Sequence, residues 1–121
     1  FRFNDLSAGP DYVLSFPFDY EVGGLGTEQE QKGREIHFKK EIPGAINASV
    51  AYPEGYDGDN AFTLRHAKTG QSLTGMTSIT GTRTALHASK SYVCPEQFIH
   101  LEIAPGKETK WRRSYSFAVK K

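Results

Sequence analysis

The feature that most limits how this chain can fold is the alternation of apolar and polar side chains along it. Between residues 12 and 22 every second residue is apolar, and the apolar set is Tyr12, Leu14, Phe16, Phe18, Tyr20 and Val22. A period of two places one set of side chains on one face of a β-strand, whereas a helical face repeats every three to four residues. The alternation therefore predicts a half-buried strand. Because Pro17 cannot donate a ladder hydrogen bond, it predicts an edge strand, a bulge or two strands joined by a kink.

The same alternation recurs along the rest of the chain, separated by turn-forming residues. We expect strands in residues 34–42, 45–52, 61–67, 96–105 and 111–121, one or two short strands in 71–91, and a mobile loop at 23–33. Strands of a parallel sheet are covered on both faces and would be apolar throughout, so alternation favours antiparallel sheets. The pattern predicts an antiparallel β-sandwich, jelly-roll or immunoglobulin-like, of seven to nine short strands; a closed β-barrel is the alternative.

The length of the chain and its charge bound the prediction further. Its 121 residues suit one domain, residues 1–121, with a single hydrophobic core. The net charge of +1 hides an asymmetry, because residues 1–31 sum to −5 and residues 107–121 sum to +5. Two interpretations stay open: the first and last strands attract each other, or the basic end binds an anionic partner. A nucleic-acid partner would require a larger positive balance, which argues against one.

Trp111 is the single tryptophan of the chain, and it lies beside Lys110, Arg112 and Arg113. It shares odd numbering with the apolar residues of the last strand. If that strand runs unbroken from residue 111, the indole lies at the mouth of the core. If the strand begins near Ser114, the ring faces solvent, where it could stack on a sugar or a base while the cations bind hydroxyls or phosphates.

Two further features of the loops suggest ligand contact. Tyr56 and Tyr92 lie near predicted loop junctions, and tyrosines on loops above a rigid sandwich commonly form recognition surfaces. Asp57, Asp59 and Asn60 crowd oxygen ligands into one loop, which points to a Ca²⁺ site. The same residues are also ordinary turn formers, so the loop has a purely structural interpretation as well.

The sequence carries no catalytic signature. Four histidines are scattered along the chain without a short metal-binding spacing, and we expect them on polar or mixed faces: His37, His66, His87 and His100. No Gly-x-Ser-x-Gly elbow occurs. The single cysteine, Cys94, excludes an intrachain disulfide and a cysteine-rich zinc site, and we expect it to be a small buried hydrophobe.

The sequence gives few indications of the cellular compartment of the protein or of its association with membranes. No apolar run approaches 18 residues, so we expect no membrane insertion. The triplet at residues 47–49 is an N-glycosylation sequon, which favours a secreted or cell-surface protein. Because the chain begins at Phe1 rather than Met, we expect a processed product or an excised domain.

Three hypotheses of function follow from these features. The first is a noncatalytic module that binds a carbohydrate or another polar or anionic ligand through Trp111, Arg112, Arg113, Lys110, Tyr56 and Tyr92. In fold class the chain is similar to the small β-sandwich modules appended to secreted enzymes, including carbohydrate-binding ones, although fold class does not fix function. The second is an adhesin-like or capsid-like domain for protein interaction or assembly. The third is a small β-fold hydrolase or lyase.

Overall fold

The fold is known from a computed structural model, which describes residues 1–3, 8–58 and 60–119. The described residues form ten strands and no helix. They therefore contain no helical segment long and apolar enough to cross a membrane. The strands are β1 (Tyr12–Ser15), β2 (Val22–Gly23), β3 (Gln29–Lys32), β4 (Glu35–Phe38), β5 (Ala45–Ala51), β6 (Phe62–His66), β7 (Gln71–Thr77), β8 (Arg83–Ser89), β9 (Tyr92–Phe98) and β10 (Arg113–Val119). The all-β prediction is confirmed, with more strands than expected.

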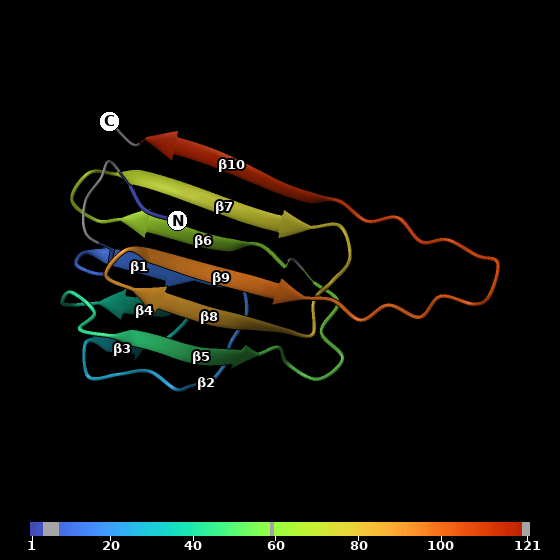
Figure 1. Ribbon diagram of the computed structural model, residues 1–121, viewed down its shortest axis with the longest axis horizontal. Coiled ribbons are helices and arrows are strands. Elements are labelled where there is room, and N and C mark those ends of the chain that lie inside the picture. The colour runs from blue at the N-terminus through green and yellow to red at the C-terminus, as the bar shows by residue number, and fades with distance from the viewer. Residues whose placement is uncertain (4–7, 59, 120–121) are drawn as a thin grey trace.

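The strands pair antiparallel in two sheets that face each other (Figure 1). The larger sheet has the order β10-β7-β6-β1-β4-β3, and the smaller sheet has the order β2-β5-β8-β9. Each sheet keeps two edge strands, so the sheets form an open β-sandwich, and the closed-barrel alternative is wrong.

Pro17 marks the place where the chain passes from one sheet to the other. β1 lies in the middle of the larger sheet, between β6 and β4, and it ends at Ser15. The next strand, β2, pairs with β5 in the smaller sheet. Of the three predictions for Pro17, the kink between two strands is therefore the one observed. Side chains from this crossing continue the core, because Phe16 and Phe18 are buried with ring centroids 5.6 Å apart.

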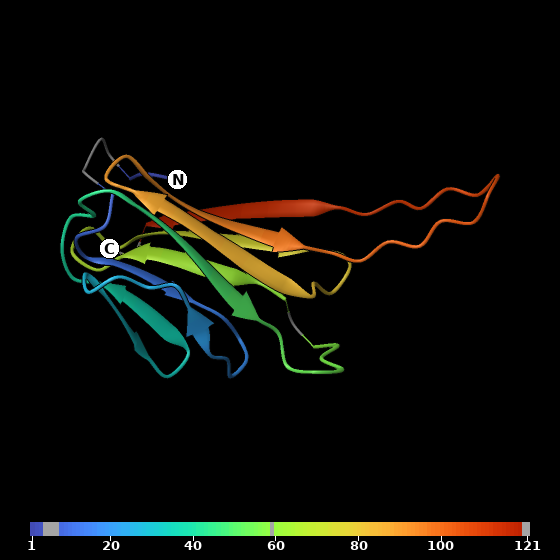
Figure 2. The ribbon, with the colours of Figure 1, turned by 60° about the horizontal axis from the view of Figure 1, so that its bottom comes forward.

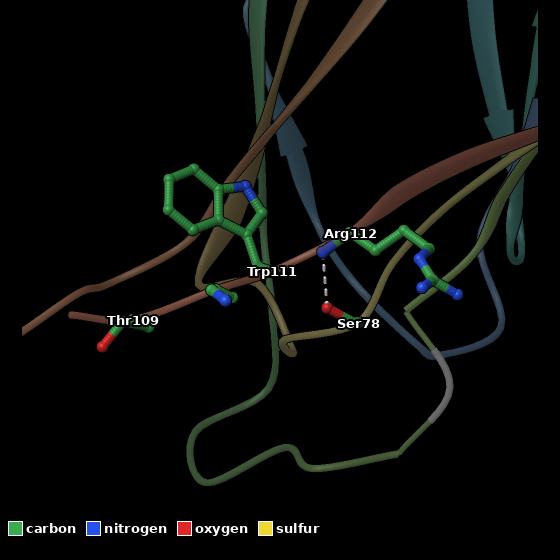
Figure 3. Close-up of a pocket in the computed structure, with 5 residues that line it drawn as sticks. Ser78, Thr109, Trp111 and Arg112 are labelled. Atoms are coloured by element: carbon green, nitrogen blue, oxygen red, sulfur yellow. Dashed lines mark hydrogen bonds between the residues drawn. The ribbon is translucent and has the colours of Figure 1, made fainter.

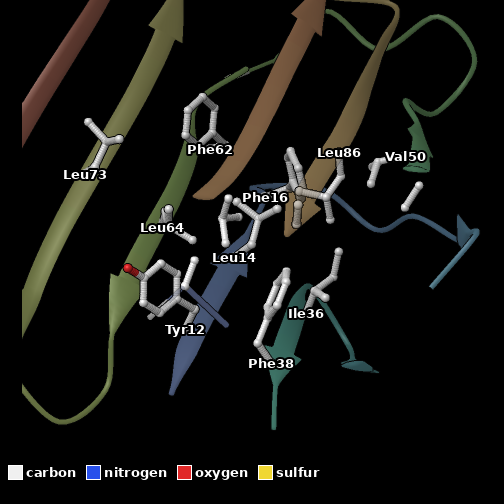
Figure 4. Packing of buried hydrophobic residues seen from close by; sticks show 14 of the residues in the cluster. Tyr12, Leu14, Phe16, Ile36, Phe38, Val50, Phe62, Leu64, Leu73 and Leu86 are labelled. Carbon is white, nitrogen blue, oxygen red and sulfur yellow. The ribbon is translucent and has the colours of Figure 1, made fainter. Parts of the chain in front are cut away.

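The core fills the space between the two sheets: both sheets contribute aliphatic side chains, whereas the aromatic ones come from the larger sheet and from segments outside the strands (Figure 4). Neighbouring strands place their apolar residues in register, since Leu14 lies opposite Ile36 on one side and Leu64 on the other. Residues directly opposite each other in an antiparallel pair share a face, so these side chains form one continuous inward layer. Leu86 and Val50 meet that layer from the smaller sheet.

Two of the predicted segment boundaries are wrong. Residues 23–33 contain β3, which pairs with β4 across a tight turn at Gly33 and Arg34. The strand was missed because it is wholly polar and carries no alternation. The strand expected at residues 96–105 ends at Phe98, and the chain then leaves the sandwich.

Residues 99–112 form an arm that projects beyond the end of the sandwich (Figure 2). A turn at Pro105 and Gly106 reverses the arm, closed by a hydrogen bond from the Lys107 backbone N–H to the Ala104 carbonyl. Gly106 has a φ of 75°, a left-handed value that glycine adopts without strain. The chain then returns along β7 as β10.

β10 differs from every other long strand because all seven of its residues are exposed. It pairs with β7 in unbroken register from Arg113 opposite Thr77 to Val119 opposite Gln71. The larger sheet has six strands and the smaller one only four, so β10 extends past the facing layer. The odd-numbered apolar residues of β10 are exposed and do not belong to the core.

Candidate functional site

Trp111 lies where the arm meets the sandwich, two residues before β10 begins. Its side chain is 48% exposed. The prediction that the indole occupies the mouth of the core is therefore wrong, and the solvent-facing alternative holds. The reason is that Trp111 precedes β10 and belongs to the arm that projects beyond the end of the sandwich (Figure 2).

An open groove of ≈ 620 Å³ surrounds the indole, and it is lined by Ser78, Thr109, Lys110, Trp111 and Arg112. Its volume lies in the range of known ligand-binding clefts. The Trp111 ring and the Arg112 guanidinium leave the backbone in different directions, as expected for successive residues of an extended chain (Figure 3). The groove thus combines one flat aromatic surface, two cations and two hydroxyl groups.

The base of the groove is fixed by an extension of the β7–β10 ladder. The Ser78 backbone N–H donates to the Arg112 carbonyl over 2.8 Å. In return, the Arg112 backbone N–H donates to the Ser78 hydroxyl oxygen, also over 2.8 Å. These two bonds fix the backbone of Arg112, the residue that follows Trp111, although both residues lie outside the strand. A fixed backbone reduces the conformational entropy that is lost when the neighbouring side chains bind a ligand.

The other predicted ligand-binding residues lie elsewhere. Arg113 turns away and donates from its guanidinium to the Gln97 carbonyl over 2.8 Å. Tyr56 is partly buried, with its ring centroid 4.9 Å from that of Phe18, in a separate depression at the same end of the sandwich. Tyr92 begins β9, whereas Arg113 contacts the other end of that strand, so Tyr92 lies at the far end of the molecule. The structure therefore unites only Lys110, Trp111 and Arg112.

Two residues of the groove were not predicted from the sequence. Thr109 could have been found, because it precedes Trp111 by two positions and an extended chain directs both side chains to one side. Ser78 could not, because only the register between β7 and β10 brings it next to Arg112. No periodic signal in residues 71–91 specifies that register.

The loop interpreted as a Ca²⁺ site has a structural role at Asn60. This residue is 5% exposed, and its amide nitrogen donates to the Thr77 hydroxyl and to the Ile79 carbonyl, each over 2.7 Å. Its amide oxygen accepts from the Thr77 backbone N–H. Asp57 is exposed, and Asp59 lies outside the described residues. Among the described residues, no group of three or more His, Cys, Asp or Glu side chains is placed to hold a metal ion.

The histidines do not form a catalytic cleft. His37, His87 and His100 each lie within 3.6 Å of a glutamate on an exposed or partly exposed surface. His66 is buried against Tyr12, with ring centroids 5.5 Å apart, so the prediction of a polar or mixed face is wrong for this residue. His66 lies on the inward face of β6, together with the buried Phe62 and Leu64.

Two ionisable groups on the outer sheet surfaces, Glu35 and Cys94, have pKa values shifted in directions that suit ion pairing rather than nucleophilic chemistry. Hydrogen bonds from His37 and then Arg65 lower the pKa of Glu35 below its usual value of 4.5. Burial raises the pKa of Cys94, and the nearby Glu96 carboxylate raises it further. A raised pKa keeps the thiol protonated at neutral pH, whereas a reactive cysteine requires the thiolate.

The acidic and basic ends of the chain do not neutralise each other through the ion pairs of the described residues. Asp19 pairs with Arg34, and Glu30 lies within 4 Å of Lys32 and Lys39. These acidic side chains are therefore paired with cations between residues 32 and 68, as is Asp11 with Lys68. Within residues 107–119, Lys110 lies 3.8 Å from the exposed Glu108, and none of the ion pairs of the described residues joins this segment to residues 1–31.

No known protein family, curated protein or solved structure matches this chain. The function is therefore argued from the residues and their geometry.

Proposed function

We propose that the protein is a noncatalytic binding module and that the groove at Trp111 binds an anionic carbohydrate. The observation that carries this proposal is a half-exposed tryptophan held between Lys110 and Arg112 by the end of the β7–β10 ladder. A tryptophan without a binding role is usually at least partly buried, because its side chain has a large apolar surface. Here that surface is offered to solvent next to two cations.

The chemistry of recognition follows from the groove lining. The flat face of the indole would cover the C–H face of a sugar ring, which removes apolar surface from water. The Arg112 guanidinium would bind a carboxylate or sulfate group through paired hydrogen bonds, and the Lys110 ammonium would add a point charge. Hydroxyls of Ser78 and Thr109 offer both donors and acceptors to the sugar hydroxyls. A neutral glycan would use the ring and the hydroxyls but not the charges.

A glycan array of acidic and neutral sugars, probed with fluorescently labelled protein, tests this proposal, because the label also reports binding by a variant that lacks the single tryptophan. We expect the protein to bind acidic glycans, and we expect binding to weaken as salt is added, because exposed charges are screened. Trp111→Ala should weaken binding about tenfold or more, as for aromatic residues at the centre of other binding sites.

The matched control is Tyr92→Ala, which removes another exposed aromatic side chain from the opposite end of the sandwich. Glycan binding should be unchanged in this variant. Glycan binding that survives Trp111→Ala, or that is lost in Tyr92→Ala, would contradict the assignment of the site. Both variants should keep the unfolding midpoint of the wild type, since neither side chain belongs to the core.

A protein-interaction function is the second candidate, and a different part of the molecule favours it. The edge of β10 is long, regular and apolar, and it does not overlap the residues that line the groove.

A further inference from the structure

The four edge strands of the sandwich differ in how they are protected against pairing with another chain. Natural sheets protect their edges with short strands, charged side chains, prolines or covering segments. β2 has only two residues. β3 has four residues, all polar, with Glu30 and Lys32 on its outer face. Both of these edges are therefore unsuited to extended pairing.

The edge formed by β9 is blocked by three separate contacts. Phe1 and Val93 exchange two backbone hydrogen bonds, of 2.7 Å and 2.9 Å, so the first residue of the chain covers this part of the edge. Pro95 lies two residues further on and directs its nitrogen, which carries no hydrogen, to the same side. The Arg113 guanidinium donates a hydrogen bond to the Gln97 carbonyl, which a pairing strand would otherwise use.

Apart from the charged Arg113 at its first position, β10 has none of these protections along its described length. It has seven residues, contains no proline and pairs with β7 without a bulge. Within the described residues, β7 is its sole neighbour in the sheet. Figure 1 shows β10 as the outermost strand, with its free side facing away from the sandwich. An edge of this kind is the feature to which an extended peptide adds as a further strand.

The direction of the free backbone groups follows from the ladder with β7. Ser78 donates to the Arg112 carbonyl, so even-numbered residues of this strand bond to β7. Backbone groups alternate sides along an antiparallel strand, which directs the N–H and C=O groups of Tyr115 and Phe117 to the free edge. A docked strand would therefore pair with the odd-numbered residues.

The side chains of those same residues form an uncovered apolar face. Tyr115, Phe117 and Val119 are 45%, 72% and 62% exposed, although they share a face with the buried Leu73. The exposed Phe1 ring lies 5.8 Å from the Tyr115 ring, centroid to centroid, and contacts this face at Tyr115. A strand added to β10 would extend the sheet, and its own apolar side chains would pack beside these residues.

Charge indicates what kind of strand fits. Lys107, Lys110, Arg112 and Arg113 precede the exposed face, and Lys120 and Lys121 follow it in the sequence. We propose that β10 binds, by strand addition, a segment of another protein that has apolar residues at alternate positions and acidic residues at its ends. A second copy of this chain fits less well, because antiparallel pairing of two β10 strands would bring their basic ends together. This proposal is independent of the glycan proposal.

A library of random peptides of roughly twelve residues, selected for binding to the wild-type protein, tests this proposal. We expect enrichment of peptides with alternating apolar residues flanked by Asp or Glu. Phe117→Lys should weaken their binding about tenfold or more, because it removes the central aromatic contact and places a charge on the docking face. The control is Ala118→Lys, which adds the same charge to the adjacent residue on the opposite face and should leave binding nearly unchanged.

Two further measurements keep the test independent of how Phe117→Lys folds. Phe117→Pro removes a backbone N–H that faces the free edge rather than β7, so it should block the peptide while circular dichroism and the unfolding midpoint stay near those of the wild type. In the wild type, bound peptide should slow hydrogen exchange at the Tyr115 and Phe117 amides.

Several results would overturn the proposal. They are a selection that yields no enrichment, enriched peptides without acidic ends, and equal binding to the Phe117→Lys and Ala118→Lys variants. A dimer of the wild type in sedimentation velocity that Phe117→Lys dissociates would assign the edge to a second copy instead. Peptide binding lost in Trp111→Ala but kept in Phe117→Lys would assign it to the groove.

Discussion

β1 and β10 belong to the same sheet and carry the same alternation of side chains, yet their surroundings are opposite. In β1, Tyr12 and Leu14 are fully buried between the two sheets. In β10, Tyr115 and Phe117 occupy equivalent alternate positions but remain exposed to solvent. The difference lies in the facing layer, because the smaller sheet covers β1 and ends before β10.

This comparison separates two roles of an apolar face. Burial of an aliphatic or aromatic side chain contributes about 1.5–3 kcal/mol to folding, so the face of β1 stabilises the sandwich. The face of β10 contributes little of this kind to the isolated chain, and its apolar surface remains available for association. Exposed apolar surface that is contiguous is typical of interaction sites, whereas single exposed residues are common everywhere.

The strongest test of the comparison is a pair of truncations, one on each strand. Leu14→Ala should destabilise the protein by about 2–5 kcal/mol, because it leaves a cavity where the two sheets meet. Phe117→Ala removes more atoms but should change the free energy of unfolding by no more than about 0.5 kcal/mol. Urea denaturation measures both values. Similar losses in the two variants would mean that β10 is covered in solution.

A second test concerns the boundary between the covered and uncovered parts of the sheet, at Gly75. A Cβ atom at this position would collide with the Phe62 ring, which lies directly opposite in β6. Gly75→Ala should therefore destabilise the protein by about 1–3 kcal/mol. Gly44→Ala is the matched control, because a Cβ there meets nothing within 4 Å. If the two variants unfold at the same urea concentration, Phe62 does not pack across β7 as described.

A third test concerns the end of the sandwich beside the arm. Asn60→Ala should destabilise the protein by about 1–3 kcal/mol, because the Thr77 hydroxyl and the Ile79 carbonyl lose a buried partner. We expect neither Ca²⁺ nor a chelator to shift the thermal unfolding midpoint of the wild type. A clear upward shift with Ca²⁺ would return this loop to a metal-binding role.

The smallest effect is expected on the outer surface of the larger sheet. The pKa of Glu35 is lowered by its hydrogen bonds to His37 and Arg65, so the carboxylate stabilises the folded state above the unfolded pKa of 4.5. This contribution is lost as the pH falls through the lower, folded pKa. The Glu35 and Arg65 side chains are 39% and 41% exposed, so solvent screens their interaction. The effect on the free energy of unfolding is therefore modest.

The measurement compares the wild type with Glu35→Gln at neutral pH and at about pH 3. The wild type should be slightly more stable at neutral pH, and the difference between the two proteins should shrink in acid. A difference that grows in acid would show that the pKa of Glu35 is raised rather than lowered in the folded state.

The sequence by itself determined the class of fold, because a period of two in the positions of apolar side chains suits only strands with two unlike faces. It also identified Trp111 and its neighbouring cations, because those residues are adjacent in the chain. It did not reveal β3, whose four polar residues pair with β4 and of which only Gln29 is buried.

Only the tertiary structure decided which apolar faces are covered. The residues of β1 and β10 follow the same local rule, but coverage depends on how far the second sheet extends, and that sheet is built from β2, β5, β8 and β9. The structure likewise decided that Ser78 joins Trp111, since strand register acts between residues 34 positions apart. Local pattern sets the faces of a strand, whereas long-range pairing determines what each face meets.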